Sequence, residues 1–323
     1  MTDLMNHMNT KDHFQLFDKR KKYKIAVGII TYKNFELLEK CITSLNKQSI
    51  KHPFDIFIVD NDLNQSSKKI VEKFKARNIF YDFESRKGIP FARNKVVSLI
   101  KNNYDFLAFI DDDEEANEDW LCSLLSTAIK YNADAVAGYV KTKLINEIPN
   151  WIKEANYLRI KKPTIKTGEI IKYCGTGNVM INCKIFIEFP VPFEERFKNM
   201  GGSDVHFFRK ISSKGYKIKW SNKSTVYENI KKERLSLKWN LLRYFRIGNS
   251  YLFSLKTSKK YIKIFLLIIQ NFIMLILLLI LSIISLILYC FSYKKYFFII
   301  IKNIMKSLGF ISGLIGIKYQ DYN

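Results

Sequence analysis

The alternation of short apolar runs with helical runs limits the fold of this chain more than any other sequence feature. Mostly apolar runs stand at Phe54–Val59 and Ile79–Phe83, and continuous ones stand at Lys24–Tyr32 and Phe106–Ile110. Their continuity and β-branched residues are typical of strands that are buried on both faces. Between them, apolar residues recur at helical spacing. This alternation predicts an α/β fold with a mostly parallel sheet and crossover helices.

Polar residues follow three of these predicted strands, at the point where each strand ends. Thr31 and Tyr32 close the first strand, Asp60 to Asp62 follow the second, and Asp111 to Asp113 follow the strand at Phe106. Ligands of open parallel sheets bind beyond the carboxyl ends of the strands. We therefore expect these side chains to converge on one site.

The acidic run that begins at Asp111 continues through Glu115, so five carboxylates stand side by side. Adjacent acids repel one another unless water or a cation compensates them. Oxygen ligands at a strand-to-loop junction suit a hard divalent ion, Mg²⁺ or Mn²⁺. The alternative is a solvated acidic loop before a helix that Asn117 caps. The neighbouring strand ends favour a metal site, and we expect Glu115 to face solvent.

Two glycine-containing segments further along the chain are candidates for the rest of the site. The GTGN turn at Gly175–Asn178 would permit close approach to a ligand, although an ordinary turn explains it equally well. Gly201 and Gly202 precede Ser203 and Asp204, and a helix is predicted over 205–213. Asp204 either complements the helix dipole or stands at the helix mouth as a general base.

The charge balance narrows the possible partners. The chain has 323 residues, of which 48% are hydrophobic, and a formal net charge of +23. Such a charge is typical of proteins that bind nucleic acid, an anionic membrane or a polyanionic substrate. Five cysteines without a CxxC pair, and residues 1–22 without an apolar core, predict a cytoplasmic setting and a flexible basic arm.

The C-terminal part of the sequence is typical of a membrane-associated region. A basic amphipathic helix is predicted over Arg234–Arg246. Ile264 to Tyr293 carry no charge, and this stretch exceeds the roughly 20 residues that cross a bilayer. The apolar stretch from Phe297 to Ile317 is interrupted by Lys302 and Lys306, which predicts a helix lying on the bilayer surface. Lysines flank the uncharged stretch on both sides and leave its orientation open.

Six motifs in order resemble the inverting glycosyltransferases of family 2, which have the GT-A fold. They are ITYKN, VDND, GIPFARN, FIDDDEE, GTGN and GGSD, and the likeness covers about Lys24 to Tyr251. The resemblance implies a Rossmann-like central sheet with flanking helices, followed by hydrophobic membrane-associated helices. We accordingly divide the chain into the arm, a GT-A domain over 23–255 and membrane-associated helices over 256–323. The nucleotide-binding half would span 23–115 and the acceptor half 116–255.

The resemblance also implies roles on the donor side of the site. Thr31 and Tyr32 would line the pocket for the nucleotide base. Asp60 would accept a hydrogen bond from the base, typically uracil, and Arg93 would face the nucleotide or hold the acidic loop.

The family's DxD motif corresponds to Asp111, Asp112 and Asp113, and Asp113 would be the most direct metal ligand. Asp111 would assist it, together with Glu228, where many relatives have a histidine. Asp204 corresponds to the general base. Many relatives have Glu before this base and Asp two residues after it, whereas this chain has Ser203 and His206.

These observations predict a metal-dependent inverting glycosyltransferase, a hexosyltransferase or related enzyme. It would transfer a sugar from a nucleotide-diphospho-sugar, typically a UDP-sugar, to a hydroxyl of a glycan or lipid-linked acceptor in surface polysaccharide or glycoconjugate biosynthesis. A metal neutralises the leaving diphosphate, and a separate carboxylate takes the acceptor proton. We expect membrane lipids but no nucleic acid as partners, and a bacterial inner-membrane protein whose catalytic domain is cytoplasmic.

Two other classes stay open from the sequence. A membrane-bound nucleotidyltransferase or phosphohydrolase would also use paired carboxylates, but the sequence lacks a second acidic cluster for a second metal. A non-enzymatic, membrane-bound polyanion-binding protein would explain the charge, but the acidic loop would repel its ligand.

Overall fold

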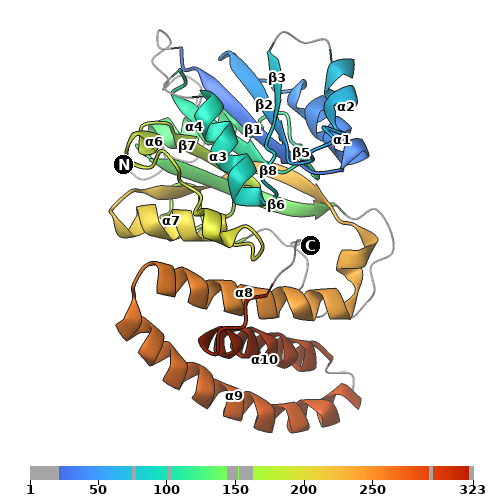
Figure 1. Ribbon diagram of the computed structural model, residues 1–323, viewed down its shortest axis with the longest axis vertical. Helices are drawn as coiled ribbons and strands as arrows, with labels where there is room; N and C mark the ends of the chain where they lie inside the picture. The colour runs from blue at the N-terminus through green and yellow to red at the C-terminus, as the bar shows by residue number, and fades with distance from the viewer. Residues whose placement is uncertain are drawn as a thin grey trace, which may run out of the picture.

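The computed structural model describes residues 22–74, 78–100, 103–143, 152, 163–290 and 294–319. The predicted arm at residues 1–22 lies outside the described residues, apart from Lys22. Figure 1 shows a twisted sheet with flanking helices at one end of the molecule and a layer of long helices at the other.

One eight-stranded sheet forms the centre of the first part, in the order β3-β2-β1-β4-β7-β6-β8-β5. Its strands are β1 (Ile25–Thr31), β2 (Phe54–Asp60), β3 (Ile79–Phe83), β4 (Phe106–Ile110), β5 (Glu114–Ala116), β6 (Ala135–Lys143), β7 (Asn178–Asn182) and β8 (Ile218–Asn229). The four apolar runs that predict strands in the first third of the sequence are β1 to β4.

The half of the sheet built from β1 to β4 is parallel, as the alternating sequence predicts. β1 pairs in parallel with β2 and β4, and β2 pairs in parallel with β3. The crossover helices are α1 (Phe35–Leu45), α2 (Lys68–Lys73) and α3 (Ile89–Ile100). Thr31 is the register partner of Asp60, so the polar ends of the first two strands lie side by side.

The other half of the sheet is mixed. β7 pairs antiparallel with β4 and β6, β6 pairs in parallel with β8, and β5 pairs antiparallel with β8. Strand β4 lies in the middle of the strand order and β5 lies at its end, and the acidic loop connects the two. The β5–β8 register places Glu114 opposite Glu228.

Apolar side chains pack on both faces of the sheet, which is why β1 and β4 read as continuous apolar runs. On one face, α1 and α4 (Trp120–Lys130) bury side chains such as Leu38 and Trp120 against β1 and β4. On the other, Val96 of α3 packs with Phe109, Phe193 and Phe207. Each large apolar side chain buried in this way contributes about 1.5–3 kcal/mol to stability.

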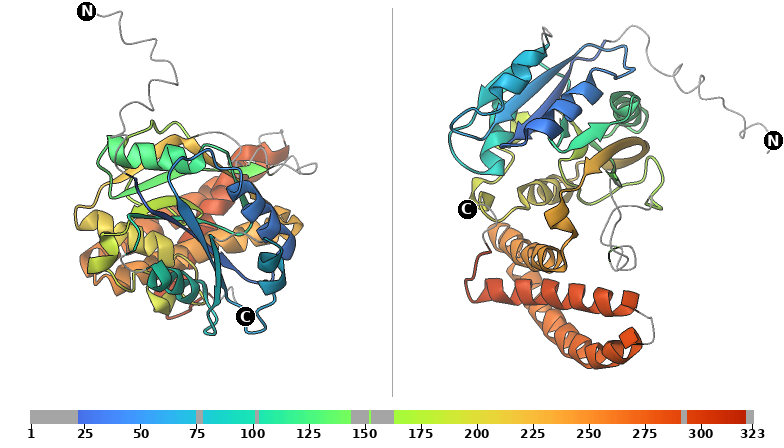
Figure 2. Two further views of the ribbon diagram at one scale, coloured as in Figure 1. Left: turned by 90° about the horizontal axis from the view of Figure 1, so that it is seen from above. Right: turned by 90° about the vertical axis from the view of Figure 1, so that its right-hand side faces the viewer.

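The remaining helices either precede the C-terminal layer in the chain or form that layer (Figures 1 and 2). They are α6 (Ile185–Glu188), the 3-10 turns η2 (Glu195–Phe197) and η3 (Lys232–Leu235), α7 (Ser203–Ser213), α8 (Leu237–Thr257), α9 (Tyr261–Cys290) and α10 (Lys294–Leu314). The basic helix predicted over 234–246 therefore begins later, at Leu237, and continues to Thr257.

α8 and α10 cross at glycines that let their backbones touch. A Cβ on Gly248 would lie 1.9 Å from the carbonyl oxygen of Lys306, and a Cβ on Gly309 would lie 1.9 Å from that of Phe245. The buried Asn249 amide donates to the carbonyl oxygens of Gly309 and Ile317 at 3.2 and 2.8 Å. α10 is thus fixed to the helix that leads out of the sheet domain.

α9 and α10 are both long and apolar enough to cross a membrane. The spans are Tyr261–Ile283, with a mean hydropathy of 3.0, and Phe297–Leu314, with 1.5. α9 exposes large apolar side chains, among them Ile262 at 80% and Phe265 at 63%. The membrane association of this region and the surface position of α10 stay predictions.

Candidate active site

Glu114, the residue that follows Asp113, holds the acidic loop between β4 and β5 in place. Ile110 is buried at the end of β4, and Asp111 to Asp113 form the turn that follows. The buried Glu114 carboxylate accepts a hydrogen bond from the backbone N–H of Asp111 at 3.0 Å. Burial and repulsion by Asp111 raise the pKa of Glu114 well above its usual range. The buried Glu114 therefore fixes the conformation of the loop.

Asp112 connects the loop to the end of β1. The Thr31 hydroxyl donates a hydrogen bond to Asp112 Oδ2 at 2.7 Å. Burial raises the pKa of Asp112 to about 6, while the hydrogen bond from Thr31 opposes this rise. Tyr32, the next residue, is 47% exposed beside this contact. The first strand end and the acidic loop thus meet, as the order of the strands predicts.

Asp113 lies beside Glu228, and the arginine between them was not predicted from the sequence. Asn229 donates its backbone N–H to the Asp113 carbonyl at 2.8 Å. Arg234 Nη1 lies 3.3 Å from Asp113 Oδ2 and 2.9 Å from Glu228 Oε1. Burial, then repulsion by Asp111, raises the pKa of Asp113 to about 7, and Arg234 opposes this rise. The only feature of the sequence that indicates Arg234 is its position as a cationic residue soon after β8.

The predicted metal ligands supply the oxygen donors that a hard cation prefers, but the guanidinium of Arg234 already lies beside them. Asp111, Asp113 and Glu228 offer only carboxylate oxygens, and burial raises the pKa of Asp111 as well as that of Asp113. A bound cation would offset these unfavourable charges. No group of three His, Cys, Asp or Glu side chains in the described part of the chain is already arranged around a metal position. Arg234 holds two of the three oxygen groups instead.

Arg93 connects the acidic loop to Asp204. Its guanidinium is almost fully buried, with Nη2 3.9 Å from Asp111 Oδ1 and Nη1 4.0 Å from Asp204 Oδ2. Nη1 also donates to Ser203 Oγ at 3.4 Å, while Nε has no hydrogen-bond partner among the described residues. Arg93 therefore lies beside the acidic loop, and the two roles expected for it, facing the nucleotide or holding this loop, stay predictions.

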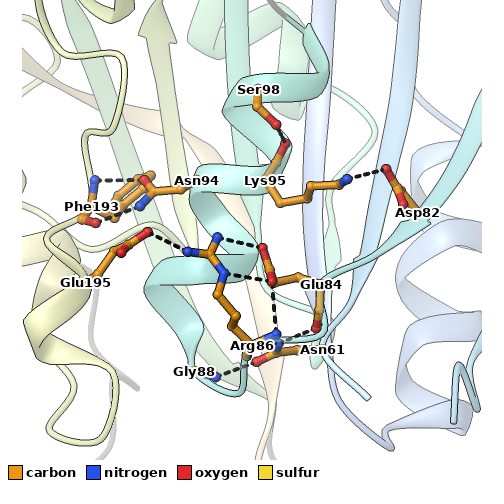
Figure 3. A network of polar contacts seen from close by, with 10 residues as sticks. All are labelled: Asn61, Asp82, Glu84, Arg86, Gly88, Asn94, Lys95, Ser98, Phe193 and Glu195. Carbon is orange, nitrogen blue, oxygen red and sulfur yellow. Dashed lines mark hydrogen bonds and ion pairs between the residues drawn. The ribbon is translucent and has the colours of Figure 1, made fainter. Parts of the chain in front are cut away.

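The GIPFARN segment, which carries Arg93, is fixed by hydrogen bonds at Gly88 and Asn94 (Figure 3). Asn61, from the VDND motif, accepts a hydrogen bond from Gly88 N–H at 2.8 Å and fixes the start of α3. Asn94 exchanges two hydrogen bonds with the backbone of Phe193, at 2.8 and 3.0 Å. Because both ends of the segment are held, Arg93 has a fixed direction between two carboxylates.

The GTGN turn lies against both acidic groups. A Cβ on Gly177 would lie 2.6 Å from Glu114 Oε1, so only glycine fits there without displacing that carboxylate. A Cβ on Gly175 would lie 3.3 Å from Asp204 Oδ2. Asp204 stands in the first turn of α7, after Gly202 in the left-handed conformation. Its side chain is 19% exposed, so it is more accessible than Asp113 at 11%.

The two departures from the family pattern around Asp204 have structural roles. Ser203 is buried and accepts the hydrogen bond from Arg93. His206 is buried beside Phe197, and its Nδ1 lies 2.8 Å from the Ser254 hydroxyl of α8. Burial lowers the pKa of His206 to about 4, so the ring is neutral at pH 7. His206 therefore joins α7 to α8, and Asp204 is the carboxylate of this helix mouth.

The remaining two predictions concern the acids Asp60 and Glu115. Asp60 is fully buried and accepts from Asp62 N–H, Ser67 N–H and the Tyr81 hydroxyl at 2.9–3.0 Å. Its predicted bond to a nucleotide base stays a prediction. Glu115, which was expected to face solvent, is 24% exposed and also pairs with Lys143 at 2.7 Å and accepts from Asn229.

Comparisons with known proteins agree with this geometry. Residues 26–189 match the family described as "Glycosyl transferase family 2". The chain is 30% identical over 232 residues to the succinoglycan biosynthesis protein ExoM of Rhizobium meliloti (strain 1021), covering 70% of this chain and 74% of ExoM. It is 22% identical over 247 residues to the chondroitin synthase of Pasteurella multocida (strain Pm70), covering 67% of this chain and 26% of the synthase.

A solved structure confirms the predicted fold class. Residues 1–349 of S. aureus TarS, solved in complex with UDP-GlcNAc, match with a TM-score of 0.52 at 18% identity. The match covers 70% of this chain and 67% of the TarS chain. At this identity the likeness shows the fold alone, a mixed α/β sheet of the GT-A type.

Proposed function

Because this chain belongs to glycosyl transferase family 2 and is a glycosyltransferase, we propose that it is a metal-dependent, inverting enzyme of surface-polysaccharide biosynthesis. It takes a sugar from a nucleotide-diphospho-sugar, a UDP-sugar, and transfers it to a hydroxyl of a glycan or lipid-linked acceptor. The similarity to a succinoglycan biosynthesis protein supports the process, and the GT-A fold shared with a UDP-GlcNAc complex supports the donor class. Family membership argues against the phosphohydrolase and polyanion-binding alternatives.

One observation carries the proposal: the guanidinium of Arg93 lies between the carboxylates of Asp111 and Asp204. The two carboxylates lie 3.9 and 4.0 Å from opposite nitrogens of one guanidinium. Transfer with inversion requires charge stabilisation on the donor side and a base on the acceptor side. This arrangement separates the two groups by the width of a guanidinium.

On the donor side, the end of β1 and the acidic loop receive the nucleotide. The exposed Tyr32 ring offers a face for the base, and Thr31 keeps Asp112 in place. Asp111, Asp113 and Glu228 would hold Mg²⁺ or Mn²⁺, which neutralises the charge of a leaving diphosphate. Arg93 and Arg234 add two guanidinium groups beside these acids, and guanidinium binds phosphate oxygens well.

On the acceptor side, Asp204 takes the proton of the attacking hydroxyl. General-base catalysis of this kind contributes about 10²–10⁴-fold. Gly175, whose missing Cβ would lie 3.3 Å from Asp204 Oδ2, leaves space beside this carboxylate for an acceptor. A single displacement at the anomeric carbon inverts its configuration.

We further propose that α9 anchors the enzyme in the bacterial inner membrane with the GT-A domain in the cytoplasm. The exposed apolar surface of α9 supports the anchor. The cysteines described in the structure, at 41, 122, 174 and 183, are all free thiols, which suits a reducing compartment.

The test measures nucleoside diphosphate release by detergent-solubilised protein with a panel of nucleotide sugars, with and without Mn²⁺ or Mg²⁺. We expect release from a UDP-sugar only when a divalent ion is present. Glu118→Gln, which changes an exposed acid near the loop, is the matched control and should keep full activity. Equal release with excess EDTA would remove the metal from the proposal, and release from no donor in the panel would remove the donor class.

A further inference from the structure

A cavity of about 220 Å³ lies where the sheet domain meets the C-terminal helices. It is bounded by the η2 segment, the end of α8 and the residues after α10. Leu252, Phe253 and Ile317 supply apolar lining, and Arg196, Lys256 and Lys318 supply cationic groups. Three separate parts of the chain thus bring one cation each to the same partly apolar space.

Two of these cations have no acidic partner within the described residues. Arg196 is neutralised by Glu194, whose Oε1 lies 2.7 Å from Arg196 Nε. Lys256 donates to the carbonyl oxygen of Gly313 at 2.8 Å, and Lys318 lies 5.6 Å from the centre of the Phe253 ring. These contacts orient both ammonium groups without neutralising them, so the cavity keeps a local charge of two.

The C-terminal side of the cavity contains no acids, and the acids on its other side, Glu194 and Glu195, pair with Arg196 and Arg86. No aspartate or glutamate stands between Glu233 and Asp321, a stretch that contains α8, α9 and α10. Repulsion among uncompensated cations is unfavourable unless an anion approaches them. A region that is apolar, cationic and free of acids is therefore suited to an anionic, amphiphilic partner.

The surface beside the cavity fits the apolar part of such a partner. α9 begins directly after the α8 segment that lines the cavity, with Lys259, Lys260 and Lys263 exposed at its start. Exposed apolar side chains then continue along the helix. Lysines at the end of a membrane-associated helix are typical of contact with lipid headgroups. A ligand could place its anion in the cavity and its acyl chains along α9.

We propose that this cavity binds the phosphate headgroup of a membrane lipid. Lys256 and Lys318 pair with the phosphate, and Leu252, Phe253 and Ile317 contact the start of the acyl chains. The site does not depend on the donor or the metal. It lies near the acceptor side of the enzyme, because Met200 lines the cavity and is followed by the segment that carries Asp204.

The experiment is native mass spectrometry of the full chain, released from nanodiscs of phosphatidylcholine doped with either phosphatidylglycerol or a polyprenyl phosphate. We expect one anionic lipid to stay bound in preference to phosphatidylcholine. One basic residue near a membrane surface contributes about 1 kcal/mol, or about fivefold in affinity. The double variant Lys256→Ala/Lys318→Ala should therefore weaken binding about 25-fold. Ile317→Trp, which fills the cavity without removing charge, should weaken it as well.

The matched control is Lys238→Ala/Lys306→Ala, which removes two exposed lysines of the same acid-free region that do not line the cavity. Binding by this control should stay within about twofold of the unchanged protein, since neither lysine faces the cavity. Equal losses in both double variants, or no preference for anionic lipid, would overturn the proposal. Saturation of the site by inorganic phosphate alone would also overturn it, because the acyl chains would then contribute nothing. Preference for one of the two doped lipids identifies the source of the phosphate.

Discussion

The two acidic groups of the active site differ in how the protein holds them. Asp113 is buried in a loop that Glu114, Asn229 and Arg234 support, and burial raises its pKa to about 7. Asp204 stands at a helix mouth between glycines and is more exposed. Asp113 is thus the more enclosed of the two, with a side chain 11% exposed against 19% for Asp204.

This difference corresponds to two chemical requirements. A group that stabilises charge acts best when it is fixed in advance and shielded from water. A base must instead reach a hydroxyl that arrives with each acceptor, so it needs open space beside it. Arg93, buried between the two groups, keeps their positions constant relative to each other. Substitutions on either side should therefore affect different steps.

The largest effect is expected from Asp204→Asn. The amide cannot accept the acceptor proton, so transfer should fall by about 10²–10⁴-fold. Donor affinity should stay unchanged, because Asp204 lies on the far side of Arg93 from the acidic loop. Initial rates of transfer and calorimetric titration with the donor measure the two quantities. Transfer at the unchanged rate would show that another group is the base.

Asp113→Asn is expected to affect the donor side by about 10²–10³-fold, the range for removal of one preorganised electrostatic group. The loss should appear in donor binding as well as in turnover, and the response to Mn²⁺ should weaken. Titration of donor against a series of Mn²⁺ concentrations measures this coupling. If Asp113→Asn and Asp204→Asn reduced the same step alone, the division between the two sides would be wrong.

Arg93→Met should lower stability as well as activity. The substitution leaves Asp111 and Asp204 near each other without their shared cation, which costs about 1–3 kcal/mol. Lys73→Met is the control, because the Lys73–Glu39 ion pair is exposed on both sides, at 56% and 44%. An exposed pair contributes at most about 1 kcal/mol. Thermal melting of the detergent-solubilised chains gives both values, and a larger loss for Lys73→Met would contradict this ranking.

Local sequence was sufficient to predict the parts of the site that lie at strand ends. β1 and β4 are continuous apolar runs, so the residues that follow them could be expected near each other, and Thr31 and Asp112 do meet. The helix that carries Asp204 begins two residues earlier than predicted, at Ser203. The parallel half of the sheet follows from the same alternation of strands and helices.

The parts that depend on distant pairing could not be predicted from local patterns. The contact of Arg234 with Asp113 exists because the β5–β8 register brings Glu228 beside the loop and η3 turns the chain back. Glu115 was expected in solvent, since nothing near it in sequence indicates Lys143 as its partner. The glycine contact between α8 and α10 likewise joins residues about sixty positions apart.

The last effect, which is absent at neutral pH, concerns His206 in the helix of Asp204. Burial lowers its pKa from 6.5 to about 4, so the unfolded chain binds a proton that the folded chain does not. Its contribution to stability is therefore present above pH 6.5 and is lost as the pH falls towards 4, at up to about 1.4 kcal/mol per pH unit. His206→Gln should remove this slope while leaving the difference between Asp113 and Asp204 intact. Melting curves from pH 4.5 to 7.5 compare the two proteins, so that the acids common to both cancel. Parallel pH profiles would mean that the pKa of His206 is the same in the folded and the unfolded chain, contrary to the effect of its burial.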